Sequence, residues 1–221
     1  MKRLFDIIVA LCVISLTWPL WLVAAVAIKM GSTGPVFYMA PRMGRDGKTY
    51  TMFKFRTMHV RDENDDDARI TAGGTDPRIF KTGKWIRRAK IDELPQFLNV
   101  LLGQMSVVGP RPEDPKIVEN FYTDWMKETL AIKPGVTSPG ALWGYTSEHR
   151  LMNNTDDPET TYRNDVLPFK LGLEYVYLQR RSFWYDVSLV FRTAMVVLKI
   201  IGGQKQFDPP KEQDLIPDHI R

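Results

Sequence analysis

The chain has 221 residues, enough for one domain with a hydrophobic core, and 44% of them are hydrophobic. Its formal net charge of +4 is a mild excess, which suits an anionic membrane surface or phosphate-bearing substrates as well as nucleic acid, so charge alone does not choose a partner. The single cysteine, Cys12, excludes an internal disulfide, and its place in an apolar run argues against cysteine chemistry.

An apolar run over residues 7–28 is long enough to cross a bilayer as a helix, since each residue adds about 1.5 Å. Lys2 and Arg3 precede the run and Lys29 follows it, so the positive-inside rule gives no direction of crossing. Pro19 stands in its middle and predicts a kink. We therefore favour a re-entrant membrane helix that enters and leaves on one side; a simple spanning anchor and a cleaved signal peptide are the alternatives.

Two strand-like runs, residues 36–39 and 50–55, flank a connection that contains an Asp-Gly turn signal. This pattern predicts a small β-hairpin. Lys54 and Arg56, at the end of the second run, are candidate contacts for substrate phosphates or lipid headgroups. A solvated surface charge is the alternative role for each of them.

Residues 91–112, IDELPQFLNVLLGQMSVVGPRP, begin with two adjacent acids. Apolar side chains at helical spacing before Gly103 predict a short helix, with Asp92 as its N-cap and Pro95 in its first turn. Unpaired N–H groups and the helix dipole should then keep the Asp92 carboxylate ionised, as a nucleophile requires. Glu93 points about 100° away around the helix and can serve a metal ion or a proton.

Arg111, fixed between Pro110 and Pro112, gives this stretch its chemical interest. Its planar guanidinium matches phosphate, so a rigidly held arginine near two acids indicates a phosphate clamp. Arg87, just upstream of the acids, can hold them or neutralise a diphosphate. The alternatives are an ordinary helix cap with an exposed acid beside it, and an ion pair that only holds the loop.

Downstream, Asp114-Pro115 is a helix-start signal, and apolar residues at helical spacing predict one helical element that ends by residue 133. Residues 136–165 predict a long irregular loop, where we expect recognition of a nucleoside or sugar. Its chemistry-bearing side chains are Tyr145, Glu148, His149 and Arg150. His149 as a catalytic base is the weaker alternative to an ordinary loop histidine.

Apolar residues repeat at helical spacing over residues 183–201, between Ser182 and a Gly-Gly pair. The resulting amphipathic helix can lie in a membrane interface or pack on the protein core, and the pattern does not decide between these. Residues 204–221 are polar and rich in proline, which predicts an extended tail.

Residues 83–112, GKWIRRAKIDELPQFLNVLLGQMSVVGPRP, resemble the signature block of the bacterial sugar transferases known as monotopic phosphoglycosyl transferases. The segments KRLFDIIVA, GPVFYMAPRMGRDGKTYTMFKFRTM, KPGVT, YRNDVLPFKLGLEYV and SFWYDVSLVFRT are similar to that family in the same order, so nearly the whole chain is covered. The connection after KPGVTSPGALWGYTSEHR is longer than the family usually has.

The resemblance implies an α+β fold: a mostly helical compact domain with a small β-hairpin, an N-terminal re-entrant membrane helix and amphipathic interfacial helices. Residues 1–30 would form the membrane helix, residues 31–203 a catalytic domain on the cytoplasmic face of the bacterial inner membrane, and residues 204–221 the polar tail.

The resemblance also implies transfer of a sugar 1-phosphate from a UDP-sugar to undecaprenyl phosphate, giving a lipid-linked diphosphate sugar and UMP. This would be the first membrane step of a surface glycan or glycoconjugate pathway. Asp92 would attack the sugar-bearing phosphorus and form a covalent intermediate. Asp92 and Glu93 would hold Mg²⁺, while Arg111 and Arg87 would bind phosphate oxygens.

No nucleic acid partner is expected, and assembly into a homo-oligomer stays open. Two other classes of function compete with the transferase: a membrane-bound hydrolase of nucleotide sugars, and a catalytically silent membrane scaffold. The intact pair of acids together with Arg111 argues against the scaffold.

Overall fold

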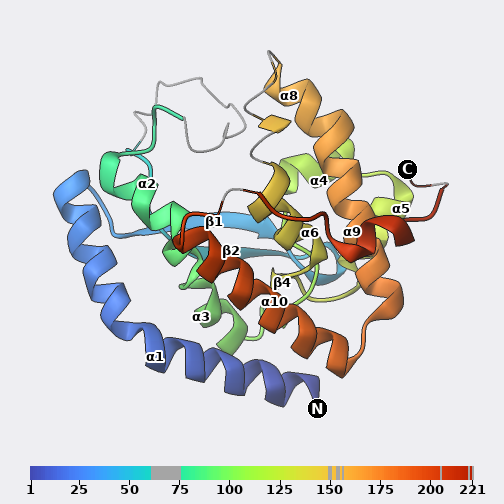
Figure 1. Ribbon diagram of the computed structural model, residues 1–221, viewed down its shortest axis with the longest axis horizontal. Coiled ribbons are helices and arrows are strands. Elements are labelled where there is room, and N and C mark those ends of the chain that lie inside the picture. The colour runs from blue at the N-terminus through green and yellow to red at the C-terminus, as the bar shows by residue number, and fades with distance from the viewer. Residues whose placement is uncertain are drawn as a thin grey trace.

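A computed structural model describes residues 1–60, 76–148, 151–152, 155, 157–204, 206–218 and 220 of the chain. Its α-helices are α1 (Lys2–Gly31), α2 (Lys81–Arg88), α3 (Gln96–Leu101), α4 (Pro115–Phe121), α5 (Asp124–Lys127), α6 (Pro139–Trp143), α8 (Pro158–Thr161), α9 (Leu167–Arg180) and α10 (Phe183–Ile201). Its strands are β1 (Phe37–Met43), β2 (Thr49–Phe55), β3 (Ser106–Val108) and β4 (Gly135–Thr137). Short 3₁₀ or π-helical turns stand at Arg45–Gly47, Ile91–Glu93, Glu128–Ala131, Gly144–Glu148, Tyr162–Val166 and Lys211–Leu215. The predicted α+β class, mostly helical, is confirmed (Figure 1).

The predicted hairpin is present and longer than expected. β1 and β2 pair antiparallel, with Phe37 opposite Phe55. Asp46 and Gly47 both take positive φ angles, 56° and 72°, which reverse the chain as the Asp-Gly signal predicts. A second, parallel pair joins β3 to β4, with Ser106 opposite Gly135. The β3–β4 pair brings the stretch after the acids beside the chain that precedes α6, and Asn99 of α3 joins it to the hairpin by accepting from Phe53 N and donating to Thr51 O.

α9 lies in the larger hydrophobic core, where Leu167, Leu171 and Leu173 are almost completely buried. Side chains of α4, α6 and the C-terminal segment pack with them. Two further cores lie against α1: one joins it to α3 and β3, and the other joins it to β2 and α2. The fold therefore surrounds the segment between α2 and α3 with packed elements.

The N-terminal end of α1 is attached to the domain by polar contacts. Asp6 is buried, and its carboxylate accepts hydrogen bonds from Ser106 Oγ (2.9 Å) and Val107 N (3.0 Å). Lys2 forms an ion pair with Asp186 of α10, with 2.7 Å between Nζ and Oδ2. The basic residues before the apolar run therefore bind the protein itself.

The far end of α1 is attached as well, through apolar packing. Ala24 and Ile28 are fully buried in the core that contains residues of β2 and α2, and Thr82 Oγ1 donates to the carbonyl of Ala27 at 2.9 Å. Between its ends α1 stays helical through Pro19, and Figure 1 shows that its axis turns in its middle part. A proline removes one backbone hydrogen bond and crowds the preceding turn, which accounts for such a bend.

The predicted helix over residues 183–201 is confirmed as α10. Ser182 caps it by accepting a hydrogen bond from Tyr185 N, and the helix ends at Gly202. The prediction of an extended tail holds only in part, since residues 206–210 form no helix or strand but Lys211–Leu215 form a 3₁₀ turn. Glu212 is buried and accepts hydrogen bonds from Tyr185 and Arg192, and Ile216 and Ile220 belong to the larger core. A few apolar side chains in this polar stretch were enough to fold it back onto α9 and α10.

Two other expectations need correction. The predicted single helical element after Asp114 is interrupted at Tyr122. The backbone of Tyr122 is extended, and its side chain is buried in the larger core. The predicted irregular loop is largely helical in the part that the structure describes, with α6 and α8 inside it. Both helices begin with a capping side chain followed by proline, Ser138-Pro139 and Asp157-Pro158. This is the same start signal as Asp114-Pro115.

Candidate active site

The two adjacent acids lie in a tight 3₁₀ turn, Ile91–Glu93, between α2 and α3. Lys90 precedes the turn in the left-handed conformation, with φ 57°. The predicted N-cap role of Asp92 is wrong, because α3 begins only at Gln96 and no side chain caps it. The left-handed Lys90 and the 3₁₀ turn direct both carboxylates into the protein, where they are 7% and 6% exposed.

Glu93 is the better bound of the two acids. Its Oε1 accepts a hydrogen bond from Arg111 Nη2 at 3.1 Å and lies 3.7 Å from Lys54 Nζ. Its Oε2 accepts a hydrogen bond from the hydroxyl of Tyr145 at 2.6 Å. Burial alone would raise the pKa of Glu93, but the charges of Arg111, Lys54 and Lys90 outweigh it and hold this pKa well below its usual range. Glu93 is therefore a fixed negative charge that ties three side chains together.

Asp92 has a different environment. Its Oδ1 is buried and has no hydrogen-bond partner among the described residues. Burial, followed by the neighbouring charge of Glu93, raises the pKa of Asp92 above its usual value, and the charges of Lys54, Lys90 and Arg87 oppose this shift. The expected helix N-terminus is absent beside this carboxylate, and the positive charge that favours its ionised form comes instead from nearby cations. An unpaired buried carboxylate oxygen is costly, which marks Asp92 as the group left free for a ligand.

Four cations surround the two acids. Lys54 and Arg111 contact Glu93 directly, and Lys90 lies over the ring of Tyr145 with Nζ 3.9 Å from its centroid. Burial lowers the pKa of Lys54 to about 8, and burial also lowers that of Lys90. Arg87 has a buried Nη1 with no partner in the part of the chain that the structure describes. Four positive side chains beside two negative ones leave an excess of positive charge that suits a phosphate-bearing ligand.

Arg111 is held by its backbone as predicted from its two prolines. Gly109 N donates to Thr137 O (3.1 Å), and Gly135 N donates to Pro110 O (2.9 Å), which fixes the turn against β4. The two glycines approach so closely that a Cβ on Gly135 would lie 2.1 Å from Gly109 N. The turn thus holds the arginine rigidly, as a phosphate clamp requires.

Sequence reasoning placed Tyr145 in a recognition loop and did not connect it with the acids. It stands in the π-helical turn Gly144–Glu148 directly after α6, and its ring lies near both Lys90 and Arg111. Glu148, in the same turn, lies 4.0 Å from the buried Lys170. His149 and Arg150 lie outside the described residues. The sequence carries no pairing signal between residues 93 and 145, because only the fold brings them together.

Arg56 does not join the site. Its guanidinium is buried and donates to Pro35 O (2.6 Å), Ser32 O (3.0 Å), Ser32 Oγ (2.8 Å) and Met58 O (3.2 Å). These contacts tie the end of α1 to the end of β2. Of the two cations in this motif, Lys54 belongs with the acids and Arg56 acts as a structural clamp.

The acids were also the predicted ligands of Mg²⁺. Within the described ranges there is no group of three or more His, Cys, Asp or Glu side chains arranged to hold a metal ion. Mg²⁺ is commonly bound by one or two carboxylates together with substrate phosphates and water, so Asp92 with its free Oδ1, assisted by Glu93, is a sufficient protein contribution. The residues fit a metal that arrives with a phosphate ligand.

Comparison with known proteins gives a consistent set of relatives. The model of the family described as bacterial sugar transferase matches residues 1–200. An undecaprenyl-phosphate glucose phosphotransferase from Komagataeibacter xylinus is 36% identical over 197 residues, covering 87% of this chain and 35% of that protein.

Two further relatives carry the name UDP-glucose:undecaprenyl-phosphate glucose-1-phosphate transferase. The one from Klebsiella pneumoniae is 39% identical over 194 residues, covering 87% of this chain and 39% of that protein. The one from Caulobacter vibrioides is 35% identical over 200 residues, covering 89% of this chain and 69% of that protein. The chain therefore spans well under half the length of the first two relatives and about two thirds of the third.

Proposed function

Because the chain belongs to the bacterial sugar transferase family, we propose that it transfers a sugar 1-phosphate from a UDP-sugar to undecaprenyl phosphate and releases UMP. The names of its relatives contain this class of reaction. The observation that carries the proposal is the buried oxygen of Asp92, which has no hydrogen-bond partner in the part of the chain that the structure describes and lies beside a cluster of cations. The product would be a lipid-linked diphosphate sugar, the start of a surface glycan or glycoconjugate.

The reaction proceeds in two displacements at one phosphorus. An oxygen of Asp92 attacks the sugar-bearing phosphorus of the UDP-sugar; the bond from that phosphorus to the bridging oxygen breaks, and UMP leaves with the electron pair. A phosphate oxygen of undecaprenyl phosphate then attacks the same phosphorus and displaces the Asp92 carboxylate. The burial of Asp92 supports this role, since a poorly solvated carboxylate is a stronger nucleophile once it is ionised, and the charges of Lys54, Lys90 and Arg87 favour the ionised form.

Arg111, Lys54 and Lys90 stabilise the negative phosphate oxygens, and Arg87 has a buried N–H without a partner among the described residues, which can do the same. Glu93 keeps Arg111 and Lys54 in place through its contacts of 3.1 and 3.7 Å. We assign Mg²⁺ to Asp92 and Glu93, where it would neutralise part of the diphosphate charge.

The surface of α1 supports placement at a membrane. Within the described residues α1 is the one helix long and apolar enough to cross a bilayer by length and composition. Large apolar side chains are exposed along it: Leu4, Ile8, Leu11, Leu16, Trp18, Leu20, Leu22, Val23, Val26 and Met30. Because both ends of α1 are attached to the same domain, we propose that it is re-entrant, bends at Pro19, and rests in the cytoplasmic side of the inner membrane.

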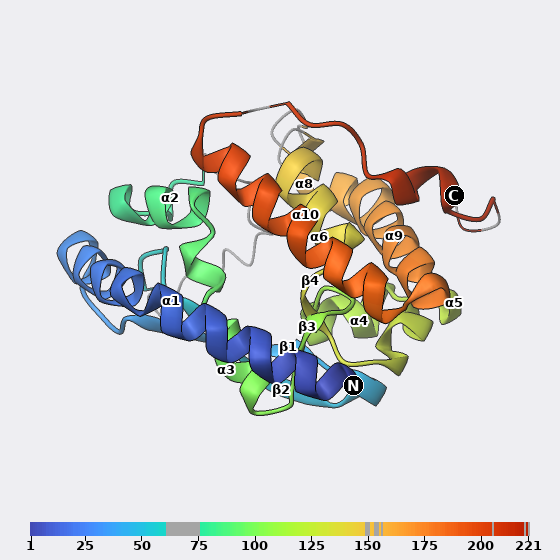
Figure 2. The same cartoon turned by 60° about the horizontal axis from the view of Figure 1, so that its bottom comes forward.

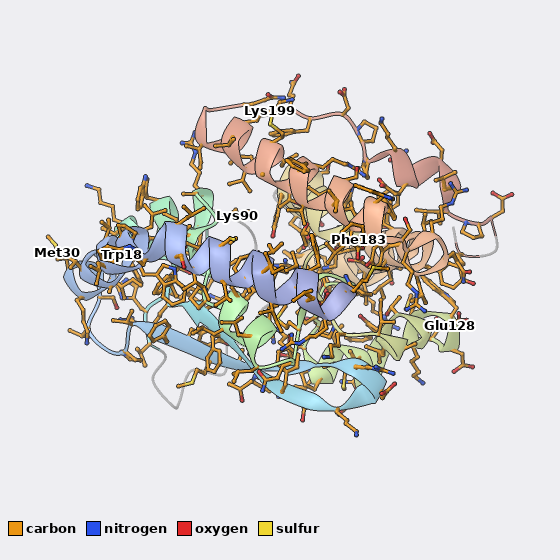
Figure 3. All side chains as sticks on the ribbon, turned by 90° about the horizontal axis from the view of Figure 1, so that it is seen from below. Trp18, Met30, Lys90, Glu128, Phe183 and Lys199 are labelled. Carbon is orange, nitrogen blue, oxygen red and sulfur yellow. The ribbon has the colours of Figure 1, made fainter. Side chains whose placement is uncertain are left out.

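α10 continues this apolar surface. Its exposed apolar side chains are Phe183, Trp184, Phe191, Met195, Leu198 and Ile201. Its first turn meets that of α1, where the rings of Phe5 and Phe183 are 5.5 Å apart, and Figures 2 and 3 show the two helices diverging from there on the same side of the molecule. Seen from below, Lys90 lies between the diverging helices (Figure 3). We propose that a lipid phosphate reaches the cations from the side on which these two helices lie.

The covalent intermediate gives the test. Wild-type protein in detergent, incubated with Mg²⁺ and its UDP-sugar but no lipid, should gain the mass of one phosphosugar on Asp92. Asp92→Asn should remain folded, with an unchanged elution profile, and gain nothing. A phosphosugar adduct on Asp92→Asn would refute the assignment of the nucleophile.

A further inference from the structure

A third carboxylate, Glu174 of α9, lies behind the active-site arginine. It is only 1% exposed, and its Oε1 accepts hydrogen bonds from the backbone N of Arg111 (3.1 Å) and from Ser138 Oγ (2.6 Å). Ser138 in turn caps α6 by accepting a hydrogen bond from Ala141 N at 2.8 Å. A single carboxylate oxygen therefore joins the arginine turn, the start of α6 and the middle of α9.

The residues around Glu174 leave room for this contact and for little else. A Cβ on Gly140 would lie 2.5 Å from Glu174 Oε1, so only glycine lets the first turn of α6 approach the carboxylate so closely. The other oxygen, Oε2, is buried without a hydrogen-bond partner among the described residues. Leaving a buried carboxylate half-satisfied costs stability, which a purely structural position would avoid by using an apolar side chain.

Arg111 is thus held at both ends by carboxylates. Glu174 binds its backbone N–H, and Glu93 binds its guanidinium at 3.1 Å. The backbone contact is important because the two prolines on either side of Arg111 have no N–H, so in the run Pro110-Arg111-Pro112 only Arg111 has a backbone donor. The hydrogen bond to this one donor fixes the direction in which the Arg111 side chain points away from the backbone.

We propose that Glu174 is a positioning residue for phosphate binding: through the backbone of Arg111 it aims the guanidinium at the diphosphate of the substrate. This inference rests on the proposed function, since it assigns Arg111 to phosphate. Glu174 contacts neither substrate nor metal, and its effect passes entirely through Arg111.

A double-mutant cycle on UDP binding tests this. Calorimetry with detergent-solubilised full chain and Mg²⁺ measures the affinity for UDP in four proteins: wild type, Glu174→Leu, Arg111→Ala and the double variant. We expect Glu174→Leu to weaken binding roughly tenfold when Arg111 is present and less than twofold when it is absent. Glu174→Gln keeps the Oε1 acceptor and should restore most of the affinity, which covers the case in which the leucine variant does not fold.

Glu212→Leu is the matched control, because Glu212 is a buried carboxylate that binds Tyr185 and Arg192 elsewhere in the fold. It should lower the thermal midpoint without changing UDP affinity. Equal losses from Glu174→Leu with and without Arg111, or failure of Glu174→Gln to restore binding, would overturn the positioning role. The readout of the cycle is UDP binding, not turnover. A wild-type chain that binds UDP but turns over no UDP-sugar would therefore refute the proposed function, while the cycle would still test the positioning role of Glu174.

Discussion

Replacing Tyr145 by phenylalanine removes one hydroxyl from the site and leaves the ring in place. The hydroxyl donates to Glu93 Oε2 at 2.6 Å, while the ring underlies Lys90 at 3.9 Å and lies 5.9 Å from the guanidinium carbon of Arg111. The substitution therefore isolates the hydrogen bond to Glu93 from the ring contacts with the two cations.

The expected loss follows from the charge on the acceptor. A hydrogen bond to a charged group contributes about 1.5–3 kcal/mol, which corresponds to a factor of about 10–100 if it is fully expressed in the transition state. Glu93 should stay ionised in the variant, because Arg111, Lys54 and Lys90 still hold its pKa below the usual range. The loss should therefore come from a misplaced Glu93 and be the same throughout the neutral pH range.

The assay is UMP release at saturating UDP-sugar and undecaprenyl phosphate, from pH 6.5 to 8.5. Tyr145→Phe should lower kcat by at least about tenfold. Tyr185→Phe is the matched control, since it removes a hydroxyl that donates to Glu212 at 2.7 Å, and it should leave kcat unchanged. A Tyr145→Phe enzyme with wild-type kcat would show that the contact with Glu93 has no part in the reaction.

Three further outcomes follow from the structure. Arg56→Lys should lower the thermal midpoint but leave KM for the UDP-sugar unchanged, because among the described residues the Arg56 guanidinium donates to backbone carbonyls and Ser32 and lies over the ring of Phe80; a raised KM would make it a substrate contact after all. Asp6→Ala should destabilise the protein to urea by about 2–4 kcal/mol, since it leaves Ser106 Oγ and Val107 N without their acceptor; an unchanged midpoint would contradict this. Burial raises the pKa of Glu174 from 4.5 to about 7, so the folded state binds the proton more tightly than the unfolded state. The contribution of Glu174 to the free energy of unfolding therefore falls by about 3 kcal/mol as pH rises from 4.5 to above 7. Glu174→Gln should abolish that decrease, and parallel stability profiles of wild type and variant would contradict it.

The elements that the sequence predicts correctly are those whose signals are local. An Asp-Gly pair between two apolar runs gives the hairpin, and Ser182 with Gly202 marks both ends of α10. That the acids and the proline-flanked arginine lie close together was also expected, whereas the ion pair of Glu93 with Arg111 corresponds to the alternative stated for that arginine.

What the sequence did not reveal depends on contacts between distant segments. Tyr145 reaches Glu93 across 52 positions, and Glu174 reaches Arg111 across 63. Nothing in the periodicity of α9 distinguishes Glu174 from an exposed acid. The left-handed Lys90, which turns both acids inward, likewise lacks a local signal, because lysine has no preference for positive φ.

The measurement that tests the central claim most directly is UMP release by the full chain in nanodiscs with Mg²⁺ and a panel of UDP-sugars, with and without undecaprenyl phosphate. The account predicts sustained release that requires the lipid and is confined to one or a few sugars, which would also identify the donor. Equal release without the lipid would contradict it and indicate a hydrolase. No release with any sugar would contradict the proposed transferase for the panel tested.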